Sequence, residues 1–242
     1  MRMKPRFRPS ALWFASFVCG CFLTSEMHEQ AHIQTGYLLY GAYGPRNFNV
    51  WQTADSDGYR WLASLAGPLL SYAAMWTGLW MSRRYPGPGI ALLFAGLPFA
   101  RTLTAIVGGG DEKVILLFFS GGGALDPIQR LGLPLVVLVL AGLPVALALR
   151  RFRIPLVHLL LLLFLPLFME FPLTHIAYNK LLERGIGSEV LFGGTPWLIQ
   201  IHFMITAIAF WRLRKHLVLS PRANAVHEKE GSLSTTLLSM SN

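Results

Sequence analysis

The chain of 242 residues is 53% hydrophobic and only 14% charged, whereas soluble domains carry about 25% charged residues. This composition argues against a soluble globular protein and indicates an integral membrane protein. The net charge of +9 does not indicate a nucleic-acid-binding protein. The Lys and Arg residues fall in short clusters between apolar runs, and no basic face is interleaved with aromatic residues.

The chain begins with a basic arm followed by a short apolar run, Ala11–Thr24. A basic segment before a short apolar run is also the pattern of a secretory signal peptide, which stays an alternative here. We favour a retained membrane span, because apolar character resumes at Tyr37–Tyr40 and the motif between the two requires a helix. Cys19 and Cys21 are too close for a metal-binding pair on a helix, so we interpret them as packing residues.

That motif is His28-Glu29-Gln30-Ala31-His32, an H-E-x-x-H pattern. Residues four apart share one face of a helix, so His28 and His32 can bind one metal ion together. Glu29 projects about 60° away from His32, close enough to reach a metal-bound water without being a ligand. Two imidazoles, one further protein ligand and a water position suit catalytic zinc. The motif therefore predicts a Zn²⁺ site with Glu29 as the general base.

Five more apolar segments follow, and we expect an all-α polytopic protein of about six transmembrane helices. They are Trp61–Met81, Ile90–Val107, Leu131–Leu149, Ile154–His175 and a shorter Pro196–Trp211. Val114–Ser120 is apolar but too short to cross, so we expect it to be re-entrant or interfacial. Residues 1–215 are predicted to form one membrane domain, and residues 216–242 a disordered cytoplasmic tail.

The basic residues predict the orientation of the six spans. With the N-terminus in the cytoplasm, 14 of the 21 Lys and Arg residues fall in cytoplasmic segments and 6 in outside loops. Arg101 lies inside a span, where we expect it to pair with a carboxylate such as Glu26 or to extend its side chain to the membrane–water interface. This bias places both termini in the cytoplasm. We expect a multi-pass protein of the bacterial inner (cell) membrane.

Three polar or helix-breaking features from separate spans fall at a similar depth. At 1.5 Å per residue, His28 lies about 26 Å along the helix from Ala11, towards the outer face. Gly67-Pro68 lies roughly 9 Å below that face in the second span, and Asp111 follows the third span on the same side. We therefore expect one site shared by these spans.

His28-Glu29-Gln30-Ala31-His32 in one span, with Ala66-Gly67-Pro68 early in the next, resembles the site-2 protease family of intramembrane zinc metalloproteases. The similarity covers roughly residues 11–115. It implies zinc ligation by His28 and His32, Glu29 as general base, and Asp111 as the third ligand. The family's usual Asp stands in an Asn-Pro or Leu-Asp-Gly context, which the Gly-Gly-Gly-Asp-Glu sequence here lacks. The alternatives for the third ligand are Glu112, Glu170, His175 and His202.

The predicted function is a membrane-embedded zinc metallopeptidase that hydrolyses peptide bonds of a membrane-bound or membrane-proximal protein substrate, in or near the lipid bilayer. One alternative is a catalytically inactive, protease-like membrane scaffold. Another is a transporter that uses intramembrane His, Glu and Arg side chains. The chain shows no internal repeat of the kind that many transporters have.

Overall fold

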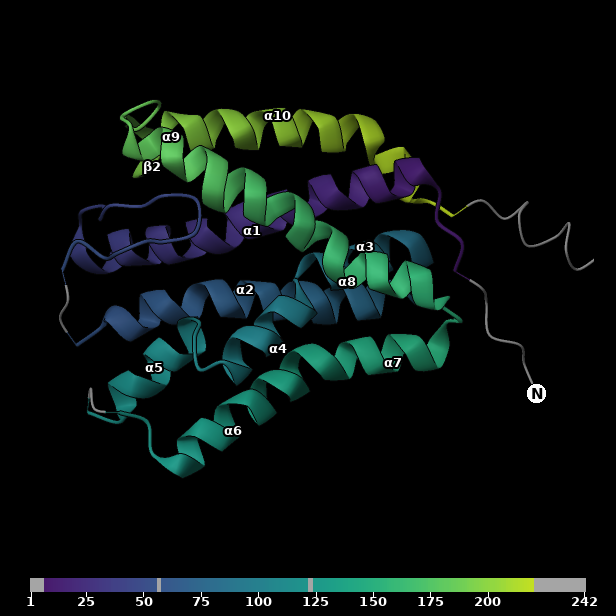
Figure 1. The fold of residues 1–242 in the computed structure, drawn as a ribbon, viewed down its shortest axis with the longest axis horizontal. Coiled ribbons are helices and arrows are strands. Elements are labelled where there is room, and N and C mark those ends of the chain that lie inside the picture. Colours follow the sequence, from purple (N-terminus) through teal and green to yellow (C-terminus); the bar gives the residue numbers. More distant parts are fainter. Residues whose placement is uncertain (1–6, 56–57, 122–123, 220–242) are drawn as a thin grey trace, which may run out of the picture.

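The computed structural model describes residues 7–55, 58–121 and 124–219, and most of these residues are helical (Figure 1). The predicted disordered tail lies outside the described residues from position 220 onward, as do the first six residues of the basic arm. The central element is α1, a 30-residue helix from Ala11 to Tyr40. The side chain of Ser10 caps it by accepting a hydrogen bond from the backbone N–H of Trp13, and Gly41 ends it in a left-handed conformation. The first predicted span and the H-E-x-x-H motif are thus parts of one continuous helix.

Helix α2 (Arg60–Met81) packs against both α1 and α3 (Pro86–Ala95). The contact between α2 and α3 depends on small residues. A Cβ atom at Gly78 would lie 2.7 Å from the carbonyl oxygen of Gly89, so these two helices approach at backbone distance. Close approach through small residues is the usual way in which membrane helices pack.

The predicted third span is broken into two helices, α3 and α4 (Pro98–Ile106). Leu97 lies between them with φ 55°, and it is the one non-glycine residue in the described chain with positive φ. This conformation is costly for a Leu side chain and is found mostly where the surroundings enforce it, often at functional sites. The hydropathy of Ile90–Val107 gave no sign of the break.

The remaining elements follow the predicted apolar segments. Helix α5 (Asp111–Phe119) contains the segment that was too short to cross, and α6 (Pro127–Val137) continues through a π-helical turn, Leu138–Gly142, into α7 (Leu143–Arg151). Helix α8 (Leu156–Glu170) continues through a second π-helical segment, Phe171–Tyr178, into α9 (Asn179–Glu183). A small antiparallel hairpin, β1 (Val190–Phe192) and β2 (Thr195–Pro196), precedes α10 (Trp197–Leu213) and a short 3₁₀ helix, Arg214–Leu217.

Among the described residues, three helical stretches are long and apolar enough to cross a membrane: Pro86–Ile106, Pro127–Arg151 and Leu156–Glu183. They coincide with the third, fourth and fifth predicted spans. The other three predicted spans coincide with α1, α2 and α10, which are not among the three long apolar stretches. Helix α10 has only 17 residues. The structure thus supports a mostly helical, membrane-associated protein.

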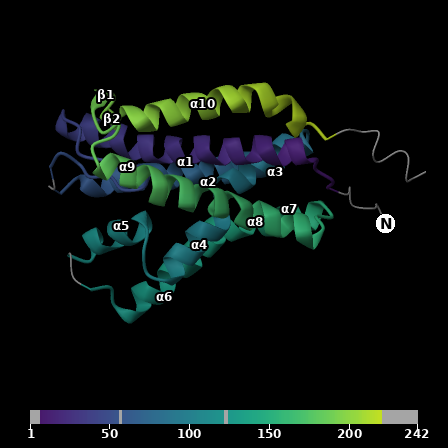
Figure 2. The same ribbon diagram turned by 45° about the horizontal axis from the view of Figure 1, so that its top comes forward.

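The two ends of the molecule are formed by different elements. At one end the indole N–H of Trp13 donates a hydrogen bond to the carbonyl of Leu217, which joins the start of α1 to the segment after α10. At the other end lie α5, α9 and the hairpin (Figures 1 and 2). The second half of α1, which carries the motif, points towards this second end.

Candidate metal centre

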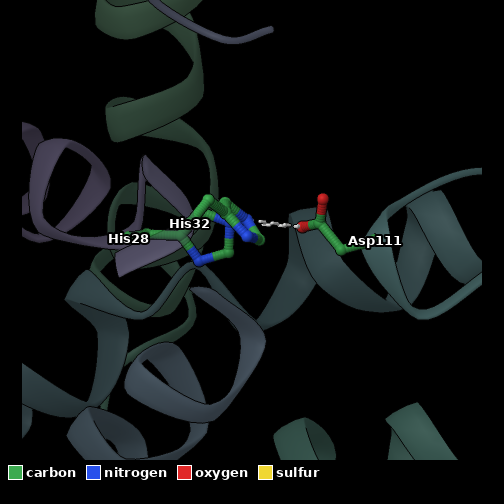
Figure 3. A group of neighbouring side chains, drawn as sticks. All are labelled: His28, His32 and Asp111. Carbon is green, nitrogen blue, oxygen red and sulfur yellow. Dashed lines mark hydrogen bonds and ion pairs between the residues drawn. The ribbon is translucent and has the colours of Figure 1, made fainter. Parts of the chain in front are cut away.

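Three side chains from two distant elements converge on one point (Figure 3). His28 and His32 project from the same face of α1, as their spacing predicts. Asp111 is the first residue of α5. The Nε2 atoms of the two histidines are 3.0 Å apart, and Asp111 Oδ2 lies 3.2 Å from His28 Nε2 and 3.5 Å from His32 Nε2. Two imidazoles and a carboxylate are thus presented together.

These distances agree with the edges of a tetrahedral zinc site. Ligand atoms bound to zinc at about 2.0–2.1 Å and at a tetrahedral angle lie about 3.3 Å from one another. The three separations in the structure, 3.0, 3.2 and 3.5 Å, bracket that value. With three protein ligands, the fourth position of a tetrahedral site stays open to water or substrate, which is the arrangement of catalytic zinc. The donor set therefore fits the metal that the motif predicts.

The second nitrogen of each imidazole is held by α2. His32 Nδ1 lies 2.7 Å from the carbonyl oxygen of Ala63, and a carbonyl can only accept, so Nδ1 carries the proton and Nε2 is free for a metal. Ser71 Oγ lies 3.0 Å from His28 Nδ1, within hydrogen-bond distance, and a hydroxyl can donate or accept there. Such outer hydrogen bonds set the tautomer and the ring orientation of metal-binding histidines.

Gly67 and Trp51 confine the two rings. A Cβ atom at Gly67 would lie 2.6 Å from Cε1 of both His28 and His32, so α2 can approach the donors only because this residue has no side chain. The Trp51 ring stacks on the His32 ring with centroids 4.4 Å apart. The Ala66-Gly67-Pro68 sequence thus has a direct steric function at the donor set, and Trp51 is a site residue that the sequence did not reveal.

Arg101, from α4, lies beside the donors. Its Nη1 is 3.2 Å from Asp111 Oδ2 and 3.7 Å from Glu112 Oε1. Its Nη2 is 2.6 Å from His28 Nδ1 and 3.3 Å from Ser71 Oγ. The expectation that Arg101 pairs with a carboxylate is confirmed, but the partner is not Glu26. A cation here offsets the negative charge that Asp111 and Glu112 bring to the site.

Asp111 is ionised. Burial by itself would raise the pKa of Asp111, but hydrogen bonds that the His28 and His32 rings donate when they are protonated outweigh burial and hold this pKa well below its usual range. Its neighbour Glu112 is turned elsewhere and accepts a 2.6 Å hydrogen bond from the Tyr72 hydroxyl. Asp111 is therefore the carboxylate presented to the histidines, and Glu112 is not.

Glu29 lies next to the donors in a cavity of about 420 Å³ that His28 and Asp111 also line. Its Oε2 atom is buried and has no hydrogen-bond partner among the described residues. A buried carboxylate oxygen without a partner costs free energy unless water, a ligand or a proton satisfies it. The position suits a general base that acts on water held between Glu29 and the donors.

The other candidates for the third ligand do not belong to the donor cluster. Glu170 and His175 line the same cavity but are not part of the cluster that could bind a metal. His202 is surrounded by aromatic rings, with centroids 5.1 Å from Phe22, 5.6 Å from Phe48 and 5.4 Å from Tyr178. Within the described chain, the cluster of three His and Asp side chains consists of His28, His32 and Asp111.

The polar segment between α1 and α2 is folded over the site, where Phe48, Asn49 and Trp51 line the cavity. Arg46 from this segment forms a bidentate pair with Glu26, with both N···O distances 2.9 Å. The Nη1 group of Arg46 also donates a 3.4 Å hydrogen bond to Thr195 Oγ1 of β2. Asn49 accepts a 2.6 Å hydrogen bond from Asn179. These contacts tie the segment to α1, the hairpin and α9.

No protein-family model, curated protein or solved structure matches this chain.

Proposed function

We propose that the protein is a membrane-embedded zinc metallopeptidase. The observation that carries the proposal is the convergence of His28 Nε2, His32 Nε2 and Asp111 Oδ2 within 3.5 Å of one another. The second support is Glu29 Oε2, which is buried at the adjoining cavity and has no hydrogen-bond partner among the described residues. The resemblance of the motif residues to site-2 proteases agrees with this proposal.

The residues have distinct roles in peptide-bond hydrolysis. His28, His32 and Asp111 would bind the zinc ion, which would polarise the substrate carbonyl and make water a nucleophile at neutral pH. Glu29 Oε2 accepts the proton of the attacking water and delivers it to the leaving amine. Ala63 and Ser71 keep the histidine rings in the required orientation.

The membrane arrangement that we propose has six spans, with α1, α2 and α10 added to the three long apolar stretches, and both termini in the cytoplasm. The excess of basic residues in the cytoplasmic segments supports it. The hydrogen bond that joins the start of α1 to the segment after α10 also supports six spans, because an even number of crossings returns the chain to the side on which it started. The substrate would be a membrane-bound or membrane-proximal protein, and the host membrane the bacterial inner (cell) membrane.

The test combines metal content with turnover in detergent-purified protein. Wild type should contain about one zinc per chain, as expected for one such site. It should cleave fluorogenic single-span peptides or casein, and removal of zinc by a chelator should stop the cleavage. Glu29→Gln should keep the zinc but lose about 10²- to 10⁴-fold in rate, the usual contribution of a general base. Equal cleavage by wild type and Glu29→Gln would refute the mechanism, and wild type without zinc would refute the metallopeptidase.

A further inference from the structure

A second cavity, of about 550 Å³, lies between α4, α5 and α6 and shares no lining residue with the cavity at the metal donors. Its walls are mostly aliphatic and come from the end of α4, from α5 and from the start of α6: Ile106, Val107, Leu117, Leu125 and Leu133. Two cationic residues, Lys113 and Arg130, also line it. The cavity thus combines apolar walls with positive charge.

The two cations face no anion among the residues that the structure describes. None of the residues that line this cavity is acidic, and neither Lys113 nor Arg130 takes part in an ion pair within the described chain. The Nε–H of Arg130 donates a 2.9 Å hydrogen bond to the carbonyl of Leu125, which fixes its guanidinium group at the cavity. Two unneutralised cations beside an apolar hollow suit an amphipathic anion.

The position of the cavity matches the surface of a bilayer. Two of the long apolar stretches end here, because α4 ends at Ile106 and α6 begins at Pro127. Trp61, at the start of α2, packs against Phe119 of α5 with ring centroids 5.1 Å apart. Trp and other aromatic residues gather at the level of the lipid headgroups. Neighbouring apolar side chains are open to lipid, and Ile128 is 83% exposed.

We propose that this cavity binds the headgroup of an anionic phospholipid. Lys113 and Arg130 contact the phosphate, and an acyl chain follows the aliphatic walls towards the membrane interior. Helix α5 has no buried residue of its own, and Lys113 follows Asp111 on it by two residues. A lipid bound to Lys113 would therefore also hold α5 in place. The binding itself does not depend on the proposed peptidase activity.

The experiment uses the full-length protein, delipidated in detergent, with binding measured by native mass spectrometry. The probes are phosphatidylglycerol and phosphatidylcholine with identical acyl chains. Phosphatidylglycerol should bind more tightly, and Lys113→Gln/Arg130→Gln should lower its affinity roughly 30-fold, as expected for two interfacial charges. The matched control, Lys180→Gln/Arg184→Gln, removes two exposed cations near α9 and should bind like wild type.

Equal affinity for the two lipids, or equal loss in both double variants, would overturn the proposal, since either result would mean non-specific attraction. Glycerol phosphate serves as the third probe. If it displaces phosphatidylglycerol at comparable concentration, the site binds a soluble phosphate and not a lipid. Lys113 and Arg130 are not buried, so the Gln variants should fold. Leu117→Trp, which fills the cavity and keeps both charges, should weaken lipid binding independently.

Discussion

His28 Nε2 and Asp111 Oδ2 lie 3.2 Å apart, although the two residues are separated by 83 positions in the chain. The motif on α1 supplies two donors from adjacent helical turns, and this local geometry follows from the helix alone. The third donor arrives only because the chain turns back through α2, α3 and α4 and then begins α5 at this point. The completeness of the donor set is therefore a property of the tertiary fold.

The first prediction distinguishes Asp111 from its neighbour. Asp111→Ala should lower zinc affinity by more than 100-fold, because loss of a ligand should exceed the 10- to 100-fold cost of losing an outer hydrogen bond. Glu112→Ala should retain the zinc, since Glu112 bonds to Tyr72 and not to the histidines. Zinc affinity is measured by competition with a chromophoric chelator. Retention of tight zinc binding by Asp111→Ala would move the third ligand to another side chain.

The second prediction concerns the closeness of α2 to the donors. In Gly67→Ala the new methyl group would collide with both imidazoles, so zinc affinity should fall at least tenfold while the helical content stays unchanged. Gly20→Ala is the control, because a Cβ at Gly20 meets its nearest neighbour, Phe210, at an ordinary 3.5 Å. Circular dichroism monitors the fold, and metal titration monitors the site. Similar zinc affinities for the two variants would contradict the steric role of Gly67.

The third prediction tests the outer hydrogen bond of His28. Ser71→Ala removes the hydroxyl 3.0 Å from His28 Nδ1, and zinc affinity should fall about 10- to 100-fold. The control is Ser16→Ala, which makes the same substitution at another position, on α1. Ser16 is buried, and its hydroxyl has no partner within the described residues, so this variant should bind zinc like wild type. An unchanged affinity in Ser71→Ala would show that Ser71 does not orient the ring.

Much of the site could be predicted from the sequence, because its strongest features are local. The helical spacing of His28 and His32 determines their common face, and counting residues along the spans placed Asp111 at the same depth. The break at Leu97 does not follow from hydropathy, since apolar residues continue on both sides of it, but Pro98 marks it, because a proline disfavours the helical conformation at the residue before it. The Arg46–Glu26 pair was also missed. A buried ion pair between a loop and a helix has no periodicity in the sequence and depends on where the loop folds.

The fourth prediction concerns the stability that this pair contributes to the covering segment. Arg46 is fully buried at its side chain and Glu26 is 10% exposed, so removal of one partner leaves a buried charge without compensation. Arg46→Ala should lower the free energy of unfolding by about 3–5 kcal/mol. The double variant Arg46→Ala/Glu26→Ala should lose less than the sum of the two single variants, because it removes the stranded charge as well. Reversible denaturation in mild detergent measures the cycle. Additive losses would mean that the two side chains do not interact, and the segment over the metal centre would then depend on the contacts of Phe48 and Asn49 with Asn179 instead.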